Sequence, residues 1–477
     1  MRNYKHYVLG ALTVAASLGF AACSSDNESV KPADDMKGFY LNLSLVGTDA
    51  TRSDQTGAVT DPGKDYESTV KTGTLFLYKD NSVVFRKQIT ESDWKTGTST
   101  LTSNSIPVSV NNVEANTPYT VYFLANSYDF AAPVSDVHTA ESGSYVGPFA
   151  TRNAFVMFNQ NDAYHKGDQY TVTFTDANKD KNNPAQVVNG NEVAGAPIKI
   201  ERIVARIDAP TSEATVISTP AEGTASESQK DAKEKVQKVE YLGYAISNIP
   251  QKTNVMQHWD GLKLVIPSHA EANYYNNHAS FGTATRLGTT AFATTPDSTY
   301  VYENIAANDG ILYTRMYYKY KVVLTASAME NADCTDGTFY RYDHKIYTSL
   351  EAIEKSIGGT NPFGEPVANL KNNTLKIQDG KITADEDEIA AFRQNYNIEV
   401  FVGGVCYYNT PVNDEKTVEG FYSVLRNTIY KLNVKNIYNV GSDVPNGNPE
   451  DLKPNYYIQV AVTVNPWILR TYDVNLE

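Results

Sequence analysis

The chain has 477 residues, 41% of them hydrophobic, and a formal net charge of −14. This length can hold two or three domains, each with its own core. The acidic balance argues against nucleic acid as a partner, because phosphate backbones are bound by positively charged surfaces. Tyrosine is the exceptional residue, with 33 Tyr against 17 Phe and 3 Trp. Tyrosine favours half-exposed pleated surfaces, so we expect an all-β protein with tyrosines on exposed strand faces rather than a helical or cytosolic α/β enzyme.

The N-terminus has the pattern of an export signal. Arg2 and Lys5 precede an apolar run over 8–22, which at ~15 residues is shorter than the about 20 that a spanning helix needs. The run ends in small residues directly before Cys23. This arrangement resembles a bacterial lipobox, in which the cysteine receives fatty acyl chains such as palmitate. We therefore predict a lipoprotein signal peptide over 1–22 and lipidation of Cys23, with a plain secretory signal as the alternative.

Two further cysteines, Cys334 and Cys406, belong to a chain that is expected to leave the reducing cytoplasm. Two cysteines alone do not establish a disulfide, so a bridge and two separate thiols both remain open. After the leader, no stretch of 18 residues is continuously apolar, so we predict no further membrane span.

Short alternating segments dominate the rest of the chain. In residues 39–45, Phe39, Leu41, Leu43 and Leu45 fall on one face, which is the pattern of a half-buried strand. Turns rich in Gly, Asn, Asp and Pro separate the later candidates, which predicts antiparallel sandwiches. Those candidates are 73–78, 82–89, 119–124, 155–158, 170–174, 198–207, 236–249, 262–266, 300–304, 316–326, 339–342, 398–408, 422–425, 428–437, 456–464 and 471–476.

Residues 210–235 are poor in large apolar side chains and rich in Ser, Thr, Ala, Glu and Lys, so we expect a long exposed loop or a linker. Two short helices are predicted over 352–356 and 387–394, because each follows a threonine with a glutamate three positions later. The acidic run 385–388 is therefore interpreted as a helix N-terminus rather than a metal site.

No catalytic or metal-binding motif stands out. The seven histidines are scattered, and there is no nucleophile elbow, P-loop, dinucleotide-binding glycine motif or Cys-x-x-Cys pair. Asp176, Asn178 and Asp180 have the first spacings of an EF-hand loop, but Lys181 and Val187 stand where that loop needs glycine and glutamate. We predict no enzymatic activity, no cofactor and no metal.

The C-terminal end alternates again in two segments. A strand there must pair within its own domain or with another chain. If a protease cut the polar loop after Arg52, strand 39–45 could leave, and a matching strand of another copy could fill its groove, as in donor-strand pilins. Such head-to-tail contacts build open filaments. The candidate donor side chains are Ile458, Val460, Val462 and Val464 in the first segment and Tyr472, Val474 and Leu476 in the second.

These features, taken in order, resemble the fimbrillins of Bacteroidia, the FimA/Mfa-type or type V pilins. The resemblance implies a shaft subunit with two transthyretin-like β-sandwich domains. It also implies export as a lipoprotein, removal of the first strand by an arginine-specific protease, and donor-strand polymerisation into a surface fimbrium that supports adhesion. The matching segments are the lipobox at Cys23, the strand that precedes Arg52, 200–208, 300–304, 422–432, 437–441 and 464–467.

The expected organisation has four parts: the signal peptide, a propeptide with the removable strand (23–52), an N-terminal sandwich (53–196) and a C-terminal sandwich (197–477) that includes the donor strand (456–476). The expected partners are other copies of the chain, tip and anchor fimbrial subunits, host or bacterial surface ligands, and the processing protease. The chain would pass from an outer-membrane lipoprotein precursor to an extracellular fimbrium. A fimbrial tip or anchor component and a surface glycan-binding lipoprotein remain the alternatives.

Overall fold

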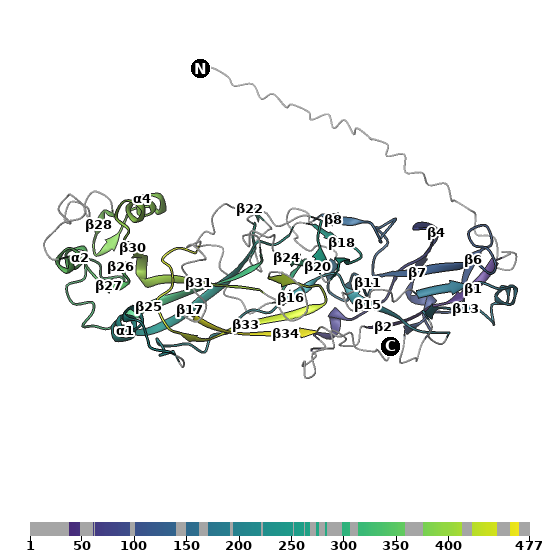
Figure 1. The fold of residues 1–477 in the computed structure, drawn as a ribbon, viewed down its shortest axis with the longest axis horizontal. Coiled ribbons are helices and arrows are strands. Elements are labelled where there is room, and N and C mark those ends of the chain that lie inside the picture. The colour runs from purple at the N-terminus through teal and green to yellow at the C-terminus, as the bar shows by residue number, and fades with distance from the viewer. Residues whose placement is uncertain are drawn as a thin grey trace, which may run out of the picture.

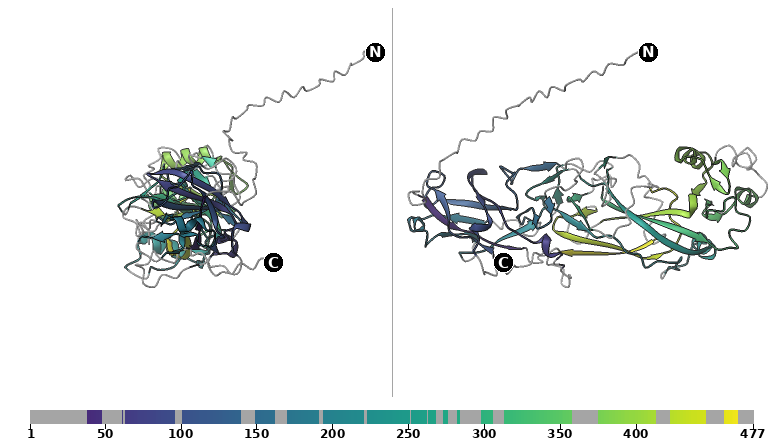
Figure 2. Two further views of the ribbon diagram at one scale, coloured as in Figure 1. Left: turned by 90° about the vertical axis from the view of Figure 1, so that its right-hand side faces the viewer. Right: turned by 180° about the vertical axis from the view of Figure 1, so that it is seen from behind.

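The computed structural model is an elongated molecule built mainly from β-strands, and it is narrow when viewed along its length (Figures 1 and 2). The predicted all-β class, with sandwiched sheets and a few short helices, is confirmed. The structure describes residues 38–47, 61, 63–95, 101–139, 149–161, 170–190, 194–220, 223–250, 252–261, 263–267, 273–275, 282–283, 298–305, 313–357, 375–412, 422–445 and 458–466.

The first half of the chain forms two sheets at one end of the molecule (Figure 1). The smaller has the order β13 (Ala185–Gln186), β1 (Gly38–Asn42), β6 (Ile106–Ser109). The larger has the order β14 (Val188–Asn189), β12 (Tyr170–Thr173), β7 (Pro118–Ala125), β11 (Met157–Asn159), β15 (Ile198–Arg202), β2 (Ser44–Gly47), β5 (Leu101–Thr102). Two more strands belong to this sheet: β3 (Gly73–Lys79) pairs with β7, and β4 (Ser82–Ile89) pairs with β3.

The second half forms two further large sheets. One has the order β23 (Thr299–Val301), β16 (Ala205–Ile207), β33 (Thr428–Ile437), β34 (Ile458–Pro466). The other has the order β22 (Gly282–Thr283), β21 (Asn273–Tyr275), β17 (Val236–Ser247), β25 (Arg315–Leu324), β31 (Val405–Pro411).

Short strands complete the described part of the fold. They pair as β9 (Ala150–Thr151) with β10 (Ala154–Phe155), β8 (Val137–Thr139) with β18 (Lys252–Asn254), β19 (His258–Asp260) with β20 (Lys263–Val265), β24 (Asn304–Ile305) with β32 (Ser423–Val424), β26 (Phe339–Tyr342) with both β27 (Lys345–Tyr347) and β30 (Glu399–Phe401), and β28 (Ile377–Gln378) with β29 (Lys381–Ile382).

The predicted strand 198–207 is divided into β15 and β16. β15 pairs with β11 and β2 of the first half, whereas β16 pairs with β23 and β33 of the second half. Ile203 and Val204, which carry the chain from one sheet to the other, are fully buried. Alternation alone does not reveal this break, because both pieces and the link between them are apolar enough to be buried.

The expectation of a loop or linker over 210–235 is wrong for its second part. Glu227–Lys235 form helix α1, whose N-cap Ser226 accepts a hydrogen bond from the backbone N–H of Gln229. The Ser-x-x-Gln spacing is a capping box, and the Ala, Glu and Lys content that suggested a linker also favours helix. The first part runs beside β33, where the N–H groups of Glu213 and Ser218 donate to strand carbonyls.

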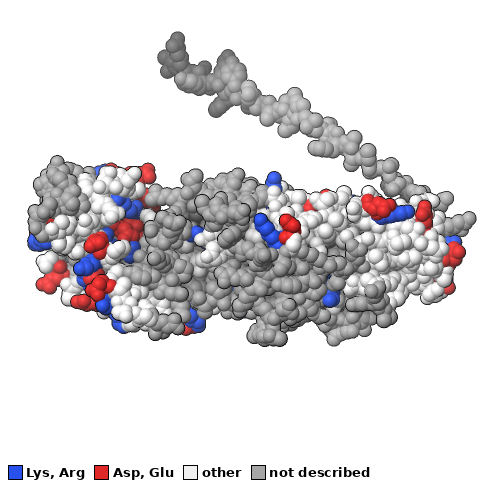
Figure 3. Space-filling model, viewed as in Figure 1, with Lys and Arg blue, Asp and Glu red and all other residues white. Residues whose placement is uncertain are grey.

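The two other described α-helices, α2 (Leu350–Ser356) and α4 (Glu386–Tyr396), lie where short helices were predicted. Their caps are Ser349 and Asp385, one and two residues after the threonines that were expected to cap them. The side chain of Asp385 accepts from the N–H of Glu388, so the acidic run begins a helix. The helices share a small apolar core with β26 and β30 at the far end of the molecule, where charged side chains of both signs gather on the face in Figure 3.

The tyrosines do not follow the expectation of exposed strand faces. Tyr318 and Tyr320 on β25 and Tyr408 on β31 are among the largest fully buried side chains. Burial is possible because the hydroxyls find acceptors: Tyr318 donates to the carbonyl of Leu432 at 3.1 Å, and Tyr408 to that of Asn439 at 2.8 Å. Loss of solvation raises the pKa of both hydroxyls well above its ordinary value, so they stay neutral.

Cys334 and Cys406 are both buried thiols and do not form a disulfide with each other. Burial raises the pKa of Cys406 to about 11, so its thiol is protonated at neutral pH. The EF-hand-like residues form a short 3-10 turn over Asp176–Lys179. Within the described residues, no group of acidic, histidine or cysteine side chains has a metal-binding arrangement, and no helix is long and apolar enough to cross a membrane.

Candidate functional site

The N-terminal strand lies between other strands in both halves of its described length. β1 pairs antiparallel with β6 and parallel with β13, and β2 pairs antiparallel with β5 and parallel with β15. The chain passes from the smaller sheet to the larger one at Leu43. Segment 38–47 is therefore an internal strand of two sheets, and its removal would leave four unpaired strand edges.

The four apolar side chains of this strand face the interior. Phe39 and Leu45 are 3% exposed, and Leu41 and Leu43 are fully buried. The ring of Phe39 lies 5.2 Å from that of Phe174. Burial of such side chains stabilises by ~1.5–3 kcal/mol each, so the four contribute roughly 6–12 kcal/mol, as much as the whole stability of a typical domain. A subunit that lost this strand would need another apolar strand in its place.

Leu43 is held by a side chain as well as by backbone. Its N–H donates to Oγ of Ser103 at 2.9 Å, and its carbonyl accepts from the N–H of Ser103 at 2.7 Å. The hydroxyls of Ser44 and Thr102 lie 3.3 Å apart. Ser103 is fully buried. It supplies a hydrogen-bond acceptor at the point where the strand changes sheets.

The C-terminal strand β34 occupies the edge of its sheet. In the described part of the chain it has one neighbour, β33, with which it forms a long antiparallel ladder from Ile458 opposite Ile437 to Pro466 opposite Thr428. Ile458, Val460, Val462 and Val464 all lie within this strand. An edge strand can separate from its sheet by breaking one ladder, whereas an internal strand must break two.

Other predicted site residues cannot be placed in the fold. Cys23, Arg52, Tyr472, Val474 and Leu476 lie outside the described residues. The structure thus brings Phe39, Leu41, Leu43 and Leu45 together in one apolar row and places Ile458, Val460, Val462 and Val464 on a separate sheet edge.

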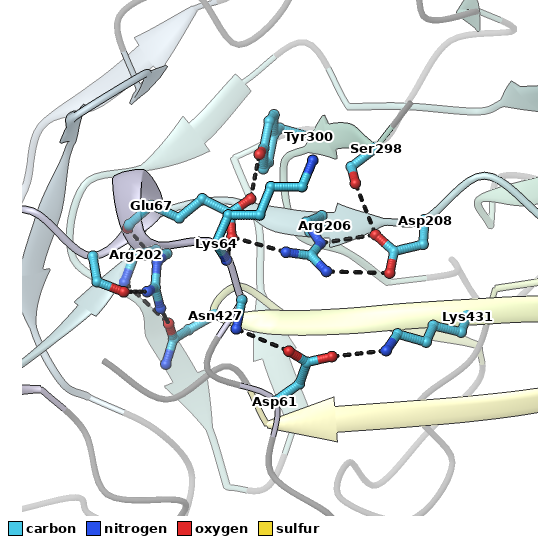
Figure 4. Close-up of polar contacts among 12 residues, drawn as sticks. Asp61, Lys64, Glu67, Arg202, Arg206, Asp208, Ser298, Tyr300, Asn427 and Lys431 are labelled. Atoms are coloured by element: carbon cyan, nitrogen blue, oxygen red, sulfur yellow. Dashed lines mark hydrogen bonds and ion pairs between the residues drawn. The ribbon is translucent and has the colours of Figure 1, made fainter. Parts of the chain in front are cut away.

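A buried polar cluster joins the two halves where the chain crosses between them (Figure 4). Its centre is Glu67, which is fully buried. Glu67 Oε2 accepts from Arg206 Nη1 at 2.8 Å, and its Oε1 accepts from the hydroxyl of Tyr300. Arg206 also donates to Asp208 at 2.8 Å. We call this set, together with Arg202, Asn427, Asp61 and Lys431, the junction cluster.

Arg202 and Lys431 extend the junction cluster to both sides of the crossover. The buried guanidinium of Arg202, on β15, donates to the carbonyl of Glu67 at 2.8 Å and to Oδ1 of Asn427 at 3.0 Å. Lys431, on β33, donates to Asp61 at 2.7 Å. Asp61 and Glu67 therefore contact strands of both halves and hold them together.

Replacing Glu67 with glutamine should lower the melting temperature by roughly 6–12 °C. Arg206 would lose its ion pair with Glu67 but keep the one with Asp208. Breaking a buried ion pair costs about 3 kcal/mol, and each kcal/mol corresponds to about 2–4 °C in domains of this size. The matched control is Glu213→Gln, which breaks an ion pair with Lys435 while the Glu213 side chain is 62% exposed. Calorimetry should give that control a shift within about 2 °C; equal shifts would contradict a structural role for Glu67.

The Asp61–Lys431 pair should lose its effect in acid. Partial burial, the largest single influence, would raise the pKa of Asp61. The hydrogen bonds from Lys431 and from the N–H of Gly63, together with the positive charges of Lys431 and Arg206, outweigh burial, so the pKa is lowered. A carboxyl group whose pKa is lower in the folded state stabilises the fold at pH values above its unfolded pKa of about 3.9. This stabilisation is lost as the pH falls through the folded pKa. Asp61→Asn should thus melt below the wild type at pH 7, and the two should converge as the pH falls below 4. A gap independent of pH would argue against the charge.

Sequence patterns do not reveal the partners of these residues. Ser103 is 60 positions from Leu43, and Arg206 is 139 positions from Glu67. Two features of the sequence hint at the junction cluster. Glu67 is an acidic residue between polar turns, and Arg202 and Arg206 are arginines within an otherwise apolar segment. Buried charges are rare unless they are paired, so arginines in a predicted strand indicate buried acidic partners elsewhere.

Comparison with known proteins identifies one family in the C-terminal part of the chain. Residues 399–473 match the family model described as "Major fimbrial subunit protein type IV, Fimbrillin, C-terminal". The match spans β31, β33 and β34, so it includes the edge strand. The resemblance to fimbrillins is thereby confirmed. No curated protein matches the chain.

Solved structures that match this chain include two fimbrial proteins of Porphyromonas gingivalis. The fimbrillin FimA has 13% sequence identity and a TM-score of 0.43, with 90% of this chain and 98% of that chain covered. The tip fimbrial protein Mfa3, solved with a C-terminal truncation, has 11% identity and a TM-score of 0.33, with 90% of this chain and 99% of that chain covered.

Proposed function

We propose that the chain is the precursor of a shaft subunit of a cell-surface fimbrium. In this proposal it is exported as an outer-membrane lipoprotein acylated at Cys23 and is cut after Arg52 by an arginine-specific protease. It then joins other copies by donor-strand exchange and forms an extracellular filament, together with tip and anchor subunits, that adheres to host or bacterial surface ligands. The family match over 399–473 supports the fimbrial assignment.

The burial of an internal strand at the start of the described chain carries the proposal. Segment 38–47 is paired on both sides, and its four apolar side chains are at most 3% exposed. Cleavage after Arg52 would disconnect this strand from the rest of the chain, while Asp61 and Glu67 would remain attached to Lys431 and Arg206. Processing could thus open a groove without releasing the segment that joins the two halves.

The donor in this proposal comes from the C-terminal end of a second copy. β34 supports this role because one ladder holds it at a sheet edge. We assign Ile458, Val460, Val462 and Val464 to the donor, with Tyr472, Val474 and Leu476 extending it. We also propose two domains that meet at Ile203 and Val204, slightly after the boundary first expected at 196, because β15 and β16 pair in different sheets.

Mass spectrometry of the N-terminus, combined with electron microscopy of the same native surface material, tests the proposal. We expect filaments whose subunits begin at Ser53 and a minor precursor pool with acylated Cys23. Surface material that retains residues 23–52 and forms no filaments would contradict the proposal, and would instead favour a monomeric lipoprotein.

A further inference from the structure

We propose that Ser103 and Thr102 set the register of any strand that fills the groove of segment 38–47, and that they match Val462 and Thr463 of a second copy. This inference rests on the proposed donor-strand function and specifies its partner. Beside Ser103 the groove passes from the smaller sheet to the larger one. An incoming strand therefore has one position at which its backbone N–H must donate to a side chain instead of to the carbonyl of a neighbouring strand.

Ser103 imposes a chemical requirement at this position. Its Oγ accepts the N–H of Leu43 at 2.9 Å, and its own N–H donates to the carbonyl of Leu43 at 2.7 Å. Ser103 and Leu43 are both fully buried, so water cannot replace either hydrogen bond. A strand that fills the groove must therefore place there a residue with an N–H, which excludes proline, and with a large apolar side chain.

Thr102 adds a second requirement one residue later. Its Oγ1 lies 3.3 Å from Oγ of Ser44, whose backbone pairs with Thr102. The next residue, Leu45, is again buried. The groove thus fits an aliphatic residue, a hydroxyl residue and an aliphatic residue in succession.

The sequence of β34 contains this pattern. Val462-Thr463-Val464 aligns with Leu43-Ser44-Leu45, and Ile458 and Val460 then align with Phe39 and Leu41. All four apolar positions are filled in this register, and Pro466 falls on Gly47, beyond the Ser103 position. A shift by one residue would turn the apolar face of the donor away from the core, and a shift by two would move Thr463 away from Thr102.

The test uses a synthetic peptide of residues 456–466 and a second peptide in which an ester oxygen replaces the N–H of Val462. Both are titrated against the processed subunit, residues 53–477. Peptide binding is measured by fluorescence anisotropy, and inhibition of polymer growth is measured in parallel. An unsatisfied buried acceptor costs about 1–3 kcal/mol, so the ester should bind roughly 5–150-fold more weakly. In Ser103→Ala the ester should bind at least as tightly as the unmodified peptide, because the N–H of Val462 then has no acceptor.

Ser103→Thr keeps the hydroxyl and should restore the difference between the two peptides, which guards against a folding defect in the alanine variant. If polymers grow and the unmodified peptide binds, but the ester has the same effect in wild type and Ser103→Ala, the role of Ser103 is wrong while the proposed function stands. If no polymers grow and neither peptide binds, the donor-strand function fails, and the register assignment fails with it.

Discussion

Replacing Arg52 with alanine should abolish polymer formation and leave a folded precursor. Segment 38–47 is an internal strand of two sheets, and its apolar side chains contribute roughly 6–12 kcal/mol in this position. An uncut chain keeps this strand at a very high effective concentration beside its groove, so a donor from another copy cannot compete with it. Immunoblots of surface fractions should show monomer in place of SDS-resistant ladders.

Two variants make the Arg52 result specific. Arg52→Lys keeps the charge but removes the guanidinium, so an arginine-specific protease should cut it poorly, and it should resemble Arg52→Ala. Arg152→Ala removes an exposed arginine that stacks on Tyr66 at 4.5 Å outside the polar loop, and it should process normally. Unchanged N-terminal trimming in Arg52→Ala would refute the assigned cleavage site.

Local patterns predicted much of this fold because they report burial along one strand. Strict alternation identified Phe39, Leu41, Leu43 and Leu45 as one buried face, and the structure places all four in the core. The same reasoning located most of β17, β25 and β33. Helix α1 was missed because its composition was interpreted as that of a linker, although the Ser226 capping box was present.

Pairing between distant segments could not be predicted in this way. Nothing near Leu43 indicates that Ser103 supplies its acceptor, and nothing near Glu67 indicates Arg206 or Tyr300. The buried tyrosines were misjudged for the same reason, because the acceptor of a buried hydroxyl such as that of Tyr318 lies on another segment of the chain, here the carbonyl of Leu432. Periodicity identifies which face of a strand is buried, and only the fold identifies what that face contacts.

A chain with aspartate at Val474 and Leu476 should fold and be processed normally but should fail to extend a filament. In the proposed exchange these two side chains continue the apolar face of the donor beyond β34. A carboxylate moved from water into apolar surroundings at the end of the donor, without a partner, costs several kcal/mol, and two of them should prevent stable association. The expected result is loss of SDS-resistant ladders on immunoblots, with a melting temperature close to that of the wild-type monomer.

The control for this donor variant lies on the opposite face of the same segment. Thr471→Asp with Asn475→Asp adds the same two charges but leaves Tyr472, Val474 and Leu476 unchanged. Since alternate side chains of a strand point to opposite faces, these charges should remain in solvent and polymers should form. Normal ladders in both double variants would exclude 472–476 from the donor and restrict it to β34, whereas loss of ladders in both would indicate a general effect of charge on this segment.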